Sequence, residues 1–169
     1  MATSLSARVA ANIAATLSNG VDVGTVSYPI SYGPNHVFSN GTGANQAKEI
    51  FTDTRTLSAS ATENLDLSGV LLDVFGNSLV FTKIKAMLVS ADPTNTNDVQ
   101  VGGAATNAFI NWVANATDVV NVKPGGMFMI TAPDANGFAV TAATGDILKV
   151  TNSGAGTSVT YTIVIIGVV

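Results

Sequence analysis

Apolar residues recur at regular intervals near the start of the chain. Between Thr3 and Asn19 they are spaced four residues apart, at Leu5, Val9, Ile13 and Leu17. On a helix this spacing puts all four on one face. Thr3 or Ser4 can cap the start of such a helix, and Asn19-Gly20 is a typical end. We therefore expect a helix over Thr3 to Asn19, with Leu5, Val9, Ile13 and Leu17 as the candidate interface residues.

The opposite face of this expected helix is built from small residues. It holds Ala7, Ala11 and Ala15, with Arg8 as its one charge. A helix face in contact with water usually carries more charge. Two interpretations stay open, because a face of alanines suits close packing in either case: the helix docks on a neighbouring subunit, or it packs on its own domain.

Residues 20–47 show weak periodicity and several turn signals, such as Tyr28-Pro29, Gly33-Pro34 and Asn40-Gly41. One short strand is expected near residues 23–30. A loop of this length is unusual inside a compact domain, and when fully extended it spans up to about 90 Å. We interpret the segment as an extended arm, so that residues 1–47 form a helix and arm for docking or oligomerisation.

From Lys48 onward the pattern changes to period two. In Ile50 to Ala61, threonines and serines alternate with the other residues, which predicts a strand with an outward hydroxyl ladder. Further short strands are expected between turns rich in Gly, Pro and Asn, at residues 63–67, 79–90, 98–101, 108–112, 119–122, 127–132, 138–140, 146–151 and 158–166. This pattern predicts a mainly β protein in which residues 48–169 form an antiparallel β-sandwich or jelly roll.

The last expected strand changes character along its length. It begins with clean alternation and becomes apolar on both faces at Val164-Ile165-Ile166. Both faces of a strand with this pattern are covered in a folded protein. We therefore expect the arm or a neighbouring chain to cover the end of this strand.

The low charge of the chain bears on whether it works alone or in an assembly. Asp, Glu, Lys and Arg make up 11% of the residues, where a typical soluble domain has about 25%. Surfaces that face other protein are depleted of charge, so the composition favours a subunit of an assembly. A secreted β domain with a surface rich in Thr and Asn is the alternative.

Several partners and compartments are disfavoured by the distribution of charge and hydropathy. The net charge is −4 and the seven basic residues are scattered, which is unlike the clustered positive field that nucleic acids require. The longest apolar run, Ile163 to Val169, is short of the ~20 residues of a membrane-spanning helix. A signal peptide is not convincing, since Asn12 interrupts the modest apolar run after Arg8.

Residues suited to catalysis or metal binding are sparse. The chain has no cysteine and one histidine, His36, in a Gly-Pro-Asn-His turn, so neither a Ser-His-Asp site nor a zinc site is indicated. Asp92 to Asp98 offers oxygens for calcium but lacks the glycine and the terminal glutamate of an EF-hand, and it also suits an ordinary turn. Trp112 is expected in the core rather than as a sugar platform. We expect no catalytic residues, no metal and no cofactor.

The strand region resembles small tailed-phage virion proteins, namely head decoration, minor capsid and fibre-associated proteins. The likeness covers residues 50–167 and rests on strand and turn segments: residues 57–67, 81–86, 101–104, 124–126, 132–134 and 144–154. It implies a β-sandwich that sits on a head or fibre lattice as a symmetric oligomer. It carries over no catalytic residue.

The leading expectation is therefore a non-enzymatic structural protein of a phage virion, on the head or its appendages. Its expected partners are copies of itself, with a trimer favoured, and other virion proteins such as the major capsid protein, but neither nucleic acid nor membrane. The alternative is a carbohydrate-binding or adhesin module, for which a host-surface glycan is the ligand. An enzyme on a β-sandwich is the third class, disfavoured by the single histidine.

Overall fold

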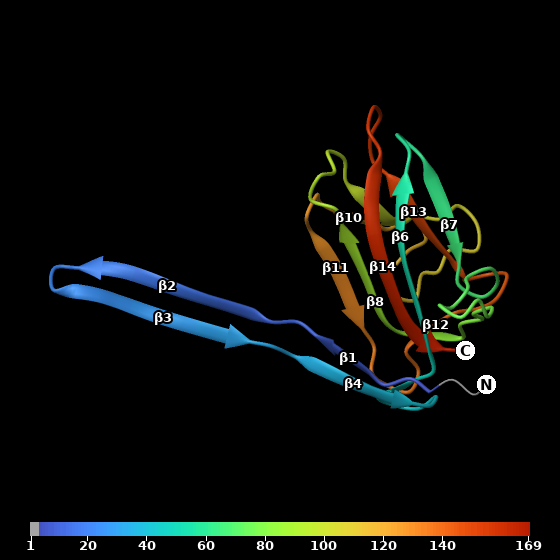
Figure 1. The fold of residues 1–169 in the computed structure, drawn as a ribbon, viewed down its shortest axis with the longest axis horizontal. Helices are drawn as coiled ribbons and strands as arrows, with labels where there is room; N and C mark the ends of the chain where they lie inside the picture. The colour runs from blue at the N-terminus through green and yellow to red at the C-terminus, as the bar shows by residue number, and fades with distance from the viewer. Residues whose placement is uncertain (1–3) are drawn as a thin grey trace.

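The computed structural model of the chain describes residues 4–169, and these residues form fourteen β-strands and no helix (Figure 1). The strands are β1 Ala7–Ala10, β2 Ile13–Val21, β3 Gly24–Tyr32, β4 Asn35–Asn40, β5 Gln46–Ala47, β6 Glu49–Leu57, β7 Thr62–Asp66, β8 Lys83–Ala91, β9 Val99–Gly102, β10 Val119–Val122, β11 Met127–Thr131, β12 Phe138–Ala139, β13 Ile147–Asn152 and β14 Val159–Val168.

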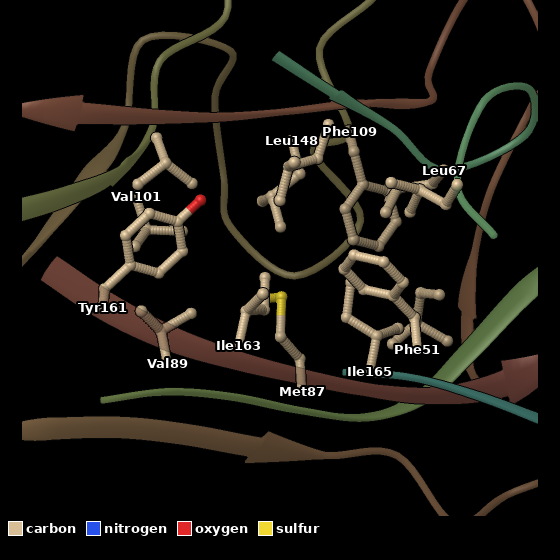
Figure 2. Close-up of a cluster of buried hydrophobic side chains, with 14 of the residues drawn as sticks. Phe51, Leu67, Met87, Val89, Val101, Phe109, Leu148, Tyr161, Ile163 and Ile165 are labelled. Atoms are coloured by element: carbon tan, nitrogen blue, oxygen red, sulfur yellow. The ribbon is translucent and has the colours of Figure 1, made fainter. Parts of the chain in front are cut away.

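Two antiparallel sheets make up the body of the molecule. One has the order β11-β8-β14-β6, with β12 beside β8, and the other has the order β10-β9-β13-β7. Alternate side chains of the strands point into the space between the sheets and form a buried apolar core, to which both sheets contribute (Figure 2). The all-β class is as predicted, and the two packed sheets are consistent with a β-sandwich.

The expected strands of the body are found close to their predicted positions, with one exception. Residues 119–122 match β10, and the predicted hydroxyl ladder is present, since Thr54 and Thr162 are hydrogen-bonded at 3.0 Å. The expected strand at residues 108–112 is wrong. This segment is a loop with turns, in which Val113 N donates to Ile110 O, and it buries Phe109 in the core.

The N-terminal part of the chain folds into a long two-stranded ribbon. Ala7 pairs with Phe38 in β1–β4, and Ile13 pairs with Tyr32 in β2–β3, so both ladders share one register. They are separated only by a break at Ala11, whose N donates to the carbonyl oxygen of Pro34 at 3.1 Å. We call β2–β3 (residues 13–32) the ribbon and β1, β4 and β5 the ribbon base. Figure 1 shows the ribbon projecting away from the body.

The predicted helix over Thr3 to Asn19 is wrong. Thr3 lies outside the described residues, and residues 7–10 and 13–21 are strands β1 and β2. A spacing of four residues fits one face of a helix, but four is also a multiple of two and fits one face of a strand. The pairing of β2 with β3, residue for residue from Ile13 to Val21, favours the strand. The short strand expected near residues 23–30 is confirmed as β3.

Candidate interaction surface

The ribbon has two chemically different faces. Residues that pair directly across an antiparallel ladder lie on the same face. Ile13 pairs with Tyr32, and Leu17 pairs with Tyr28. Leu17 is 75% exposed and Tyr28 is 66% exposed. Seven large apolar side chains on this face are about half or more exposed: Ile13, Leu17, Val21, Val26, Tyr28, Ile30 and Tyr32.

The opposite face of the ribbon is made of small and mostly polar residues. Its cross-strand pairs are Ala14 with Ser31, Thr16 with Pro29, Ser18 with Ser27 and Gly20 with Thr25. The one charged residue of the ribbon is Asp22, in the turn that joins the two strands. The ribbon is therefore amphipathic, and no segment within residues 4–169 covers its apolar face.

The same apolar face is covered where the ribbon meets the body. The register of β2–β3 continues into β1–β4, where the pairs on this same face are Val9 with His36 and Ala7 with Phe38. Phe38 is fully buried and packs in a second apolar cluster with Ala47 and Ile166. The apolar face is therefore continuous: its base packs against the body sheet, and its outer part along the ribbon is exposed. The base of this face covers the end of β14, as expected for the arm.

Backbone and side-chain hydrogen bonds fix the ribbon base to the body. Asn45 N donates to the carbonyl oxygen of Pro133 at 2.7 Å, and Lys48 N donates to that of Gly167 at 2.8 Å. The side chain of Lys85 is fully buried, and its Nζ donates to the carbonyl oxygens of Gly43 and Asp134. Burial lowers the pKa of Lys85, which the nearby Asp134 carboxylate partly opposes. These bonds hold the ribbon base and the segments beside it against the body.

A groove of about 690 Å³ lies beside the ribbon base. We call it the base groove. Its walls come from the segment before β1, the start of β6, the loop before β8 and the last residue of the chain, and include Leu5, Lys48, Ile50, Phe75, Leu79 and Val169. Phe75 is 77% exposed. The groove is thus a second surface with exposed apolar side chains, beside the ribbon base.

A tight turn presents Phe75 at this groove. Asp73 Oδ1 accepts hydrogen bonds from the backbone N of Phe75 and of Asn77, both at 2.8 Å, and Oδ2 accepts one from Asn77 Nδ2 at 2.8 Å. The hydrogen bond from the Asn77 side chain, with the backbone bonds, lowers the pKa of Asp73. These hydrogen bonds favour the ionised form of Asp73 and define the shape of the loop.

A partly buried polar cluster joins the two body sheets. Tyr161 from β14 donates its hydroxyl proton to Glu63 Oε1 at 2.6 Å, and Arg55 Nη1 donates to Glu63 Oε2 at 2.7 Å. Arg55 Nε also lies 3.0 Å from Asp53 Oδ2. Burial, and then the bond to Glu63, raise the pKa of Tyr161. Tyr161 is 1% exposed, so this cluster is suited to holding the sandwich closed.

The other residues considered from the sequence have structural partners. Asp92 Oδ1 accepts from Thr94 N at 2.8 Å and Asp98 binds Lys123 at 2.6 Å, which fits a turn rather than a calcium loop. Trp112 is partly buried, packs on Phe128 and donates its Nε1 proton to the carbonyl oxygen of Phe109. Within residues 4–169, no three His, Asp or Glu side chains cluster as metal ligands would. The described residues contain no helix that could cross a membrane.

Of the four candidate interface residues, Val9, Ile13 and Leu17 lie on one face of the ribbon and its base, and Leu5 lies just before β1. They are found in two environments. Leu5 and Val9 are partly buried against the cluster around Phe38, whereas Ile13 and Leu17 are exposed. Their cross-strand partners Tyr28 and Tyr32, and Ile30, which lies opposite Ala15 on the same face, were not predicted from the sequence. The signal that could have found them is alternation of apolar with small or polar residues in both halves of the hairpin.

No protein-family model and no curated protein matches the chain. Among solved structures, one match is a crystal structure of FlhE, which is 16% identical to this chain with a TM-score of 0.33. The match covers 69% of this chain and 93% of that one. A likeness this loose supports no argument about fold or function, so the function has to be inferred from the chain's own geometry.

Proposed function

We propose that this chain is a non-enzymatic structural protein of a tailed-phage virion, and that it holds neighbouring subunits through its ribbon. The observation that carries the assembly role is the continuous apolar face, buried at Phe38 and uncovered from Ile13 to Tyr32. In this proposal residues 48–169 supply a rigid sandwich, and residues 1–47 supply the docking device.

The energetics of the ribbon support a partner. A two-stranded ribbon is marginally stable alone in water, and an exposed strand edge with apolar side chains is a site for pairing with other chains. Covering the seven large side chains of the apolar face would contribute on the order of 5–10 kcal/mol before the entropy cost of association. Repetition of such contacts over a lattice adds avidity.

The phage part of the proposal has a separate support. It rests on the resemblance of the strand and turn segments between residues 50 and 167 to small virion proteins. The expected partners are copies of this chain, with a trimer favoured, and the major capsid protein. Immunogold labelling of virus particles from the organism that encodes the chain tests this part. Gold on the head or its appendages supports a virion protein, and unlabelled particles contradict it.

Carbohydrate binding is the second candidate, favoured by one observation. Phe75 is exposed beside Asn77 and Ser78 at the base groove, and an aromatic ring next to polar groups is a common sugar contact. Glycan-array binding that disappears in Phe75→Ala would support this candidate.

The assembly role is tested by the native mass of the full chain in light scattering. We expect a defined oligomer for the unaltered protein and a monomer for Leu17→Ser/Tyr28→Ser, which removes one cross-strand pair from the apolar face. The matched control is Ser18→Asn/Ser27→Asn, the next pair along the same ladder on the opposite face. Equal masses for all three proteins would contradict the role of the apolar face.

A further inference from the structure

The apolar face of the ribbon is large enough to form a stable interface by itself. Its seven large side chains are between 48% and 75% exposed. At about 150–250 Å² for each such side chain, one ribbon presents roughly 650–1,000 Å² of exposed apolar surface, and an interface of standard size takes about 800 Å² from each partner. We propose that this face packs on the same face of the ribbon of a second copy, with the two ribbons antiparallel. This inference rests on the proposed function and names the partner surface.

The chemistry of the face suits contact with an identical face. Asp22, the one charged residue of the ribbon, lies in the turn, so the face itself carries no charge. Two copies of the face can therefore meet without like-charge repulsion and without burying an unpaired ion. Figure 1 shows the ribbon clear of the body along its length, so that a second ribbon can lie on it. The resulting ribbon pair is a four-stranded sandwich, whereas a two-stranded ribbon alone is marginally stable.

The position of Asp22 favours antiparallel ribbons. In a parallel pair both turns lie at the same end, so the two Asp22 carboxylates repel each other. In an antiparallel pair with full overlap, the turns lie at opposite ends. Since β2 has nine residues at ~3.4 Å each, the two carboxylates are then about 30 Å apart, which is beyond the Debye length of about 8 Å. The charge of the turn therefore opposes only the parallel pair.

The taper of the apolar face favours the same direction. Ile13 and Tyr32 form a large cross-strand pair near the base, and Val21 and Gly24 form a small one near the tip. Two tapering faces fill the space between them evenly when the thick end of one lies over the thin end of the other. Two parallel faces would meet at the base and stand apart at the tip. With full overlap of antiparallel ribbons, Leu17 lies at the centre of the pair, over Leu17 of the second copy.

The ribbon pair has two-fold symmetry, and both chains use the same surface. It therefore closes after two ribbons and leaves none of this face open for a third. If the chains are also grouped as trimers, three ribbon pairs join two trimers into a closed hexamer.

Distances between spin labels on the polar face test this contact and leave the apolar face unaltered, because the natural chain has no cysteine. Full chains are labelled at Thr25→Cys, near the tip, or at Ser31→Cys, near the base, both on the polar face. The two labelled chains are mixed in dilute solution and concentrated together. Electron paramagnetic resonance should then give a tip-to-base distance between copies that is shorter by about 5–10 Å than the tip-to-tip and base-to-base distances, since like ends are offset by about 20 Å along the strands. A tip-to-base distance longer than the other two would indicate a parallel pair and overturn the proposal.

Disruption of the apolar face provides the control. Adding Leu17→Ser/Tyr28→Ser to the labelled chains should remove the short tip-to-base distance, because it removes the central cross-strand pair of the face. If the unaltered protein is an oligomer but no short tip-to-base distance is found, the ribbon pair is overturned while the proposed assembly role stands. If the natural chain is a monomer at every concentration, both are overturned.

Discussion

Leu17 lies directly opposite Tyr28 in the ribbon with both side chains exposed, and on the same face of the same register Ala7 lies opposite a fully buried Phe38. The body covers the base of this face and leaves the rest open. A protein that needed the hairpin only for its own core would end it near Asn35. We therefore propose that the uncovered part of this face is a surface for other subunits.

Phe38 should control the attachment of the ribbon base. Phe38→Ala removes the largest side chain of the cluster with Ala47 and Ile166, which should weaken docking of the base by about 3–5 kcal/mol. Hydrogen exchange should become faster over residues 35–47 while β14 stays protected. Val37→Ala, at an exposed position on the opposite face, should change stability by no more than about 0.5 kcal/mol. Equal effects of the two substitutions would contradict the packing described.

Asn152 should be important for the end of the sandwich remote from the ribbon. It is 2% exposed, its Nδ2 donates to the carbonyl oxygens of Ser58 at 3.0 Å and Thr157 at 2.8 Å, and its Oδ1 accepts from Asn97. Asn152→Ala leaves these buried groups unpaired and should cost about 2–3 kcal/mol in urea unfolding. Asn121→Ala, which loses one exposed bond to Gln100, should cost about 0.5 kcal/mol or less.

Tyr161 should make stability sensitive to alkaline pH. Its pKa is raised by burial and by Glu63, so above the ordinary tyrosine value of about 10 the unfolded chain loses this proton while the folded chain keeps it. Stability should then fall as pH rises through this range. Tyr161→Phe should be less stable by about 1–2 kcal/mol near neutral pH, and the difference from the natural protein should narrow above about pH 10. A difference that stays constant would contradict the raised pKa.

The body of the protein was largely predictable from its sequence, because period-two alternation translates directly into which side chains face the core. Val159, Tyr161 and Ile163 alternate with threonines, and all three are buried. The segment around Trp112 was not predictable in this way. Its apolar residues lie in a loop and are buried from there. In a loop, backbone turns rather than alternation decide which side chains point inward.

The ribbon was misread because its decisive information is long-range. Leu5, Val9, Ile13 and Leu17 fit helix and strand equally well, and the choice depends on a partner strand that begins at Gly24. The base groove could not be predicted either. It is assembled from segments as distant as Leu5, Phe75 and Val169, which only the folded chain brings together.

The central claim is that other subunits cover the apolar face of the ribbon, and amide hydrogen exchange of the full chain tests it most directly. Exchange over residues 13–32 is compared in concentrated and in diluted protein, with β8 and β14 as internal references. We predict slow exchange in the ribbon of the concentrated protein and fast exchange on dilution, because a lone two-stranded ribbon opens readily, while the references do not change. Equally fast exchange in the ribbon at both concentrations would contradict the claim.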